Sequence, residues 1–339
     1  MKPFYACIVG MALTGTVALA QKPPTNQQDG LRRLQITQSV PMKGKTGEIV
    51  FTPKCDQEGN VYVRFYNRDA VPHDPVYKFN KEGQQEAVYS LQSDVEFQPK
   101  GAGALDFAIG KDGTVYLLAS SKAGNYIITY AKNGAVKSKV KLAVRFQPFH
   151  FGVFDSGEFL VTGGGNKYGP ETYNISTAVF DRSGALHKSV ELPEDKPFID
   201  AARRGDAQFA EAGGGGNFAA ERGQVTGGSD GNIYVVRWTT PARIYAIAPS
   251  GDVVRTFEVK PDWEGRKPDG AYSHAGLLAL YYGGLQDEPG RSMIRVVRLD
   301  SGEGQASYDI SGTGAILTCY SDAGFTFLGG DKLLFAQLR

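Results

Sequence analysis

Short runs of alternating apolar and polar residues recur along the chain, and each run ends in a turn that contains glycine. Alternation with a period of two predicts half-buried β-strands, and the glycine turn after each run predicts a tight hairpin. The turns contain Gly83, Gly134, Gly184, Gly251 and Gly302. Their spacing is roughly 50 residues, except for one longer interval between the third and fourth, and a period of this size indicates one repeated supersecondary unit.

A second hairpin precedes each of the first four of these turns. Its turns read Glu58-Gly59, Asp112-Gly113, Ser156-Gly157 and Asp230-Gly231, each between apolar runs rich in β-branched and aromatic residues. These dipeptides are typical of hairpin loops. Each unit therefore holds four antiparallel strands in roughly 40–50 residues, which is the size of one β-propeller blade.

The number of units predicts how the ring closes. After the fifth unit, the chain has three more strand-like runs, Ile316–Cys319, Phe325–Phe327 and Leu333–Leu338, and then ends. An isolated alternating run, Leu34–Val40, precedes the first unit. We expect it to complete the sixth blade, because closure removes the unpaired strand edges that promote aggregation. The predicted fold is an all-β, six-bladed β-propeller over residues 34–339.

The long interval marks an insertion at residues 193–223, between blades three and four. Part of it, residues 199–212, could form a short helix, and a loop of this length is usually a functional lid or disordered. Residues 21–33 form a flexible tether rich in proline and glutamine.

Residues 1–20 have the pattern of a secretory signal peptide. Lys2 is followed by a mostly apolar run, and Ala18-Leu19-Ala20 is a small-residue cleavage site. A membrane anchor is the alternative, but the apolar run is shorter than a bilayer span requires. We expect an exported protein, periplasmic or extracellular, with no membrane span.

Charge restricts the partners. The chain carries 37 basic and 36 acidic residues, and loss of Lys2 with the signal peptide balances them. A balanced surface argues against nucleic acid as a partner, because nucleic-acid binding needs a basic surface. The expected partner is a small molecule, a peptide or a protein, and the protein is expected to be a monomer.

One unit resembles a known family. Residues 229–236, SDGNIYVV, with residues 243–251, RIYAIAPSG, resemble the NHL-repeat and related six-bladed propellers, and the first two units match more loosely. The resemblance implies the fold. Such propellers include metal-dependent lactonases of the gluconolactonase kind, streptogramin lyases and binding modules. The fold alone therefore does not indicate the function.

A candidate site follows from equivalent positions in successive blades. Asp106, His150 and Gln224 each lie seven residues before the glycine of the first hairpin turn, and we place His274 at the comparable point of blade five. These polar residues are expected to ring one mouth of the central tunnel, near the long loops between blades. The alternative is that polar residues line a tunnel only because it is wet.

The insertion is expected to lie over this mouth and to bring Arg203, Arg204 and Arg222 to it. In a binding scaffold, which we favour, these arginines would hold an anionic or peptidic ligand. In the alternative, a metal-dependent hydrolase or lyase, His150 would be a base or metal ligand and Asp106 its partner. The histidines show no metal-ligand spacing, so a divalent metal is expected only under that alternative.

Cys55 and Cys319 are the cysteines that remain after removal of the signal peptide. They lie on inner hairpins of blades one and six, which should be neighbours, in an oxidising compartment. We expect a disulfide between them, with two unpaired buried cysteines as the alternative.

Overall fold

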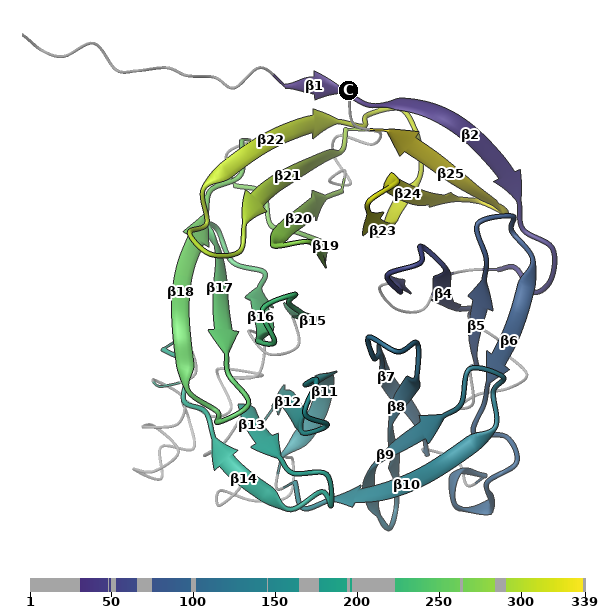
Figure 1. Ribbon diagram of the computed structural model, residues 1–339, viewed down its shortest axis with the longest axis vertical. Helices are drawn as coiled ribbons and strands as arrows, with labels where there is room; N and C mark the ends of the chain where they lie inside the picture. Colours follow the sequence, from purple (N-terminus) through teal and green to yellow (C-terminus); the bar gives the residue numbers. More distant parts are fainter. Residues whose placement is uncertain are drawn as a thin grey trace, which may run out of the picture.

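A computed structural model confirms the six-bladed β-propeller (Figure 1). It describes residues 31–47, 49, 53–65, 75–98, 102–144, 146–164, 177–193, 196, 223–262, 265–283 and 291–337. Each blade has four antiparallel strands, arranged from an inner strand at the channel to an outer strand. The alternating runs therefore form strands, as their period predicts.

The first three blades follow one another directly along the sequence. Blade one contains β3 (Lys54–Cys55), β4 (Val61–Arg64), β5 (Val76–Phe79) and β6 (Gln85–Tyr89). Blade two contains β7 (Gly103–Ile109), β8 (Val115–Ser121), β9 (Gly124–Tyr130) and β10 (Val136–Leu142). Blade three contains β11 (Gln147–Val153), β12 (Phe159–Gly164), β13 (Thr177–Phe180) and β14 (Leu186–Ser189).

The last three blades complete the ring. Blade four contains β15 (Gly223–Gly227), β16 (Ile233–Arg237), β17 (Ala242–Ile247) and β18 (Val253–Val259). Blade five contains β19 (Gly270–His274), β20 (Leu277–Tyr282), β21 (Met293–Arg298) and β22 (Gly304–Asp309). Blade six contains β23 (Ile316–Ser321), β24 (Gly324–Gly329) and β25 (Lys332–Gln337), and its fourth strand is β2 (Gln35–Pro41). A 3-10 turn, η2 (Val95–Phe97), connects blades one and two.

The predicted ring closure is confirmed. Strand β2 pairs antiparallel with β25, from Gln35 opposite Gln337 to Pro41 opposite Lys332. The disulfide is also present, with the Cα atoms of Cys55 and Cys319 5.3 Å apart. Two independent links, one of backbone hydrogen bonds and one covalent, thus join the beginning of the ring to its end.

The amino-terminal segment differs from the expected flexible tether at its end. Arg32–Arg33 form a short strand, β1, that pairs in parallel with the outer strand β22 of blade five. Blade five is therefore a five-stranded sheet (Figure 1). The two arginines gain backbone hydrogen bonds at the open edge of that blade. The polar character of their side chains does not predict this strand.

The repeated turn motif has a physical basis. Its glycines adopt positive φ, for example 76° at Gly113 and 81° at Gly231, a conformation that side chains disfavour. In blade four, the Asp230 carboxylate accepts hydrogen bonds from Asn232 and from the hydroxyl of Tyr234, at 2.7 Å for the latter. The motif therefore closes the turn and satisfies a buried tyrosine hydroxyl at once.

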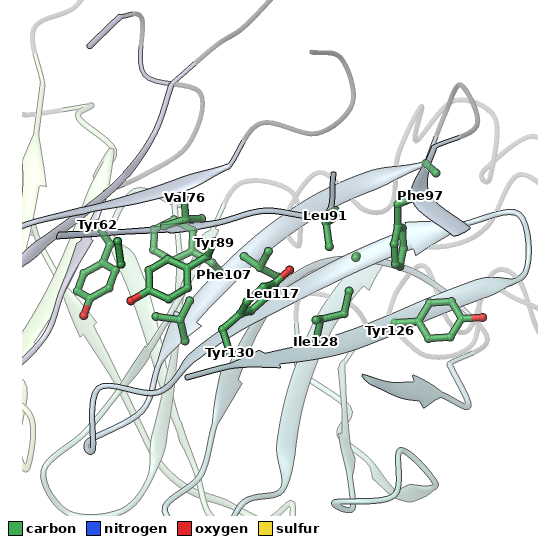
Figure 2. Close-up of a cluster of buried hydrophobic side chains, with 14 residues drawn as sticks. Tyr62, Val76, Tyr89, Leu91, Phe97, Phe107, Leu117, Tyr126, Ile128 and Tyr130 are labelled. Carbon is green, nitrogen blue, oxygen red and sulfur yellow. The ribbon is translucent and has the colours of Figure 1, made fainter. Parts of the chain in front are cut away.

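Aromatic side chains fill the space between blades. Figure 2 shows the cluster between blades one and two, where Tyr89 and Tyr130 meet edge to face with ring centroids 5.8 Å apart. Their hydroxyls donate to the carbonyls of Lys132 and Ser90. Apolar burial thus holds the blades together while the polar tips remain satisfied.

Several predictions concern residues outside the described ones: the signal peptide at 1–20, most of the tether, and most of the insertion at 193–223 with its expected helix. Within the described part of the chain, the structure contains no helix that is both long and apolar enough to cross a membrane.

Candidate functional site

The central channel contains a cavity of about 470 Å³ at the rim where the inner hairpins turn. All six blades contribute to its wall. Charged and polar side chains around it include Lys54, Lys111, Asp155, Thr226, His274 and Asp322. The apolar part of the wall includes Ala108, Phe151 and Val225. A concave space with mixed polarity and walls from six chain segments is a typical ligand site.

Asp106, on the inner strand β7, connects three blades. Its Oδ1 accepts hydrogen bonds from the Phe107 amide at 2.8 Å and from Lys54 Nζ of blade one at 2.9 Å. Its Oδ2 accepts from the Phe151 amide of blade three at 3.2 Å and lies 3.5 Å from Nδ1 of His150. Asp106 is buried, with 4% of its surface exposed.

The ionisation of Asp106 follows from these contacts. Burial raises the pKa of the carboxyl, but the charge of Lys54 and the hydrogen bond and charge of His150 outweigh it and lower the pKa to about 2. Asp106 is therefore ionised at neutral pH, and its charge is held by donors from blades one, two and three.

Gln224, on the inner strand of blade four, has the same position in its blade as Asp106 and a related role. Its Nε2 donates to the Ala271 carbonyl at 2.7 Å, and its Oε1 accepts from the Ala271 amide at 2.8 Å. The amide side chain thus extends the backbone hydrogen bonding from blade four to blade five. Gln224 also borders the cavity.

The predicted ring of four residues is divided between two levels. Asp106, His150 and Gln224 each lie in the fourth residue pair from the inner hairpin turn. His274 lies in the first pair, opposite Leu277. Three residues of strand separate the two levels, about 10 Å along the channel.

The shift accompanies a shorter first hairpin turn in blade five. Ala275 and Gly276 alone connect β19 to β20, with φ of 46° and 78°. The residue of blade five that matches Gln224 in height is Ala271, as their hydrogen bonds show. His274 borders the cavity, whereas His150 contacts Asp106 deeper in the ring. The expected position of His274 is therefore corrected.

The cavity also lies at the other rim from the one expected. The sequence placed the site where long loops enter the inner strands, but the lining includes the hairpin turns at Asp56, Lys111, Asp155 and Asp322. Arg203, Arg204 and Arg222, which were expected over the site, lie outside the described residues.

Two polar pairs mark the cavity wall between blades four, five and six. The Nε2 atom of His274 lies 2.7 Å from Oδ1 of Asp322, and the imidazole packs edge to face on Tyr320. Thr226 and Ser273 share a hydroxyl hydrogen bond of 2.8 Å. These groups give the wall both donors and acceptors.

Four charged residues of the cavity were not predicted from the sequence: Lys54, Lys111, Asp155 and Asp322. Lys111 and Asp155 form an ion pair between blades two and three, and both lie in turns. Charged residues in turns are common, so only the three-dimensional convergence of several turns distinguishes them. Lys54 could have been found, because it directly precedes Cys55 on an inner strand.

Among the described residues, no group of three or more His, Cys, Asp or Glu side chains is arranged to hold a metal ion.

Comparisons with known proteins establish the architecture. No protein-family model and no curated protein matches the chain. A candidate exported protein from Bacteroides fragilis has 10% identity, a TM-score of 0.55, and coverage of 90% of this chain and 95% of its own. A protein of unknown function from Bacteroides thetaiotaomicron has 12% identity, a TM-score of 0.51, and coverage of 88% and 72%.

Virginiamycin B lyase from Staphylococcus aureus has 14% identity and a TM-score of 0.49, with coverage of 91% of this chain and 100% of its own. At such identities the likenesses to the two Bacteroides proteins show the fold alone, which is that of a propeller. The narrower resemblance to NHL repeats stays a prediction.

Proposed function

We propose that this protein is an exported binding module that takes a small polar ligand, or the end of a peptide, into the central cavity. The cavity carries this proposal. Its volume of about 470 Å³ lies within the range of small-molecule sites, roughly 300–1,000 Å³.

The chemistry of the wall supports a polar ligand. Lys54, Thr226, Ser273 and His274 bring hydrogen-bonding groups to a space that is also lined by apolar surface. Most of these polar groups already have protein partners, so they are held in place before a ligand arrives. Preorganised groups lose little entropy on binding, which favours affinity.

A single substitution tests whether ligands enter this cavity. Gly227 borders it, and a Cβ added there would meet no atom within 4 Å. Gly227→Trp should therefore fill open space and block binding without unfolding the blade. Val95→Trp, on the exposed turn η2, is the matched control, because Val95 is 82% exposed.

The assay is a thermal-shift screen of amino acids, short peptides, sugars and organic acids, followed by calorimetric titration. Compounds that bind the wild type should bind Val95→Trp equally and lose binding to Gly227→Trp. Binding that is equal in all three proteins would place the ligand elsewhere and refute the proposal.

A metal-dependent hydrolase or lyase is the alternative function. The pair formed by Asp106 and His150 favours it, because an ionised carboxylate at one imidazole nitrogen orients the other nitrogen as a base. Stoichiometric divalent metal in the purified protein would support this alternative, and metal analysis tests it directly.

Export is part of the proposal. The pattern of residues 1–20 supports it, and so does the Cys55–Cys319 disulfide, since disulfides form mainly outside the cytoplasm. We expect the secreted form to be a monomer, because β2 closes the ring by covering the edge of β25 that would otherwise be open.

A further inference from the structure

Lys54 places its ammonium group at the cavity wall, in an unusual environment for a lysine. The side chain is only 15% exposed. Its Nζ donates to Oδ1 of Asp106 at 2.9 Å and to the carbonyl oxygen of Phe107. Nζ also lies 5.0 Å from the centroid of the Phe107 ring.

An ammonium group has three N–H donors and no acceptor. Within the described part of the chain, two of the Lys54 donors have protein partners, Asp106 and Phe107. Lys54 borders the cavity, so the third donor can be satisfied there. A donor on a charged, largely buried group gains more from an acceptor than an exposed one does.

Asp106 does not depend on Lys54 alone, because it has several other donors. Asp106 is shared among Lys54, His150 and the amides of Phe107 and Phe151. The Asp106 carboxylate is thus stabilised by several donors, of which Lys54 is one. The other lysine at the cavity, Lys111, is engaged with Asp155 at the rim.

We propose that Lys54 is the anchoring residue of the cavity and receives a carboxylate group of the ligand through a charge-assisted hydrogen bond. This inference rests on the proposed function and defines its ligand class. The carboxylate could belong to a small organic acid or to the C-terminus of a peptide, and the same donor serves both.

The wall opposite Lys54 fits the remainder of such a ligand. It comes from blade four, where the cavity is bordered by Thr226, Ser229 and Asn232. These neutral hydroxyl and amide groups can bond to hydroxyl or peptide groups of the ligand.

The experiment uses the full mature protein and two pairs of probes. Succinate is compared with its uncharged diamide, and triglycine with its C-terminal amide. Binding is followed by the backbone amide signals of Ala108 and Gly152, which border the cavity, in ¹H–¹⁵N spectra. We expect saturable shifts with at least one carboxylate and at least about tenfold weaker binding of its amide, the ratio that one such bond supplies.

Three variants test the role of Lys54. Lys54→Met should weaken carboxylate binding at least about tenfold, whereas Lys54→Arg should retain most of it. Lys122→Met, the matched control, removes an exposed lysine that does not border the cavity and should leave the affinity nearly unchanged. Tighter binding of triglycine than of succinate would identify a peptide C-terminus as the source of the carboxylate. Tighter binding of succinate would identify a small organic acid.

Lys54→Met leaves Asp106 without one partner, so its folding needs a second measurement. In wild-type protein labelled at the lysine side chains, the Nζ signal of Lys54 should shift with succinate but not with its diamide. Equal binding of acid and amide, an unchanged affinity in Lys54→Met, or no carboxylate binding overturns the inference. If Gly227→Trp abolishes binding but Lys54→Met does not, only this inference fails. Carboxylate binding that persists in Gly227→Trp refutes the proposed function as well.

Discussion

The Cys55–Cys319 disulfide allows a quantitative test of how the ring is held closed. It joins inner strand β3 of blade one to inner strand β23 of blade six, across the junction between the first and last blades. Replacing both cysteines with alanine removes this link and leaves the β2–β25 pairing in place.

The expected magnitude follows from the length of chain that the bridge encloses. For a sequence separation of 264 residues, the chain-entropy model gives a stabilisation of about 5–6 kcal/mol. With an unfolding entropy of about 2.1 cal/mol/K per residue, a domain of roughly 300 residues should lose about 9 °C in melting temperature.

Differential scanning calorimetry of the wild type and the Cys55→Ala/Cys319→Ala variant checks this. A reducing agent should lower the melting temperature of the wild type to that of the variant, and it should not affect the variant. An unchanged melting temperature in the variant would show that β2 alone supports closure and that the entropy argument does not apply here.

Two further predictions concern the closing strand and the buried carboxylate. Deletion of residues up to Met42 removes β2 and exposes the edge of β25, so the truncated protein should aggregate or melt several degrees lower. Light scattering measures the aggregation, and calorimetry measures the melting temperature. A truncated protein that stays a stable monomer would refute the role of β2. Asp106 has a pKa of about 2 in the folded protein, which is below its value in the unfolded chain. The ionised carboxylate therefore stabilises the fold by about 2 kcal/mol above pH ~4, and this contribution is lost as the pH falls toward 2. Urea unfolding between pH 5 and 2 should show a smaller pH dependence for Asp106→Asn than for the wild type, and equal slopes would contradict the assignment.

The architecture could be predicted from the sequence because its signals are local. A turn that requires positive φ selects glycine, as at Gly113 and Gly231, and alternation on either side sets the strand faces. Ring closure was predictable for the same reason: the last unit had three strands, and Leu34–Val40 supplied the fourth. The structure shifts that strand by one residue, to Gln35–Pro41.

The candidate site was less predictable because its geometry is not local. Counting from turn glycines placed Asp106, His150 and Gln224 correctly at one height. The count could not show that Asp106 and Gln224 point to the next blade, since that depends on how adjacent sheets face each other. His274, which was placed without this count, lies at another height, in the residue pair next to the hairpin turn.

The divided ring suggests how a propeller can separate stability from binding within one channel. Midway along the channel, the side chains of Asp106 and Gln224 reach the backbone of the next blade, at Phe151 and Ala271. Polar residues there are hydrogen-bonded between blades, because a buried donor or acceptor without a partner destabilises the fold. At the rim of the hairpin turns a cavity remains, and a side chain such as Lys54 can serve both purposes. Under the proposed function, substitutions in the turns can change the ligand without loss of the contacts that hold the ring, whereas Lys54, on inner strand β3, takes part in both.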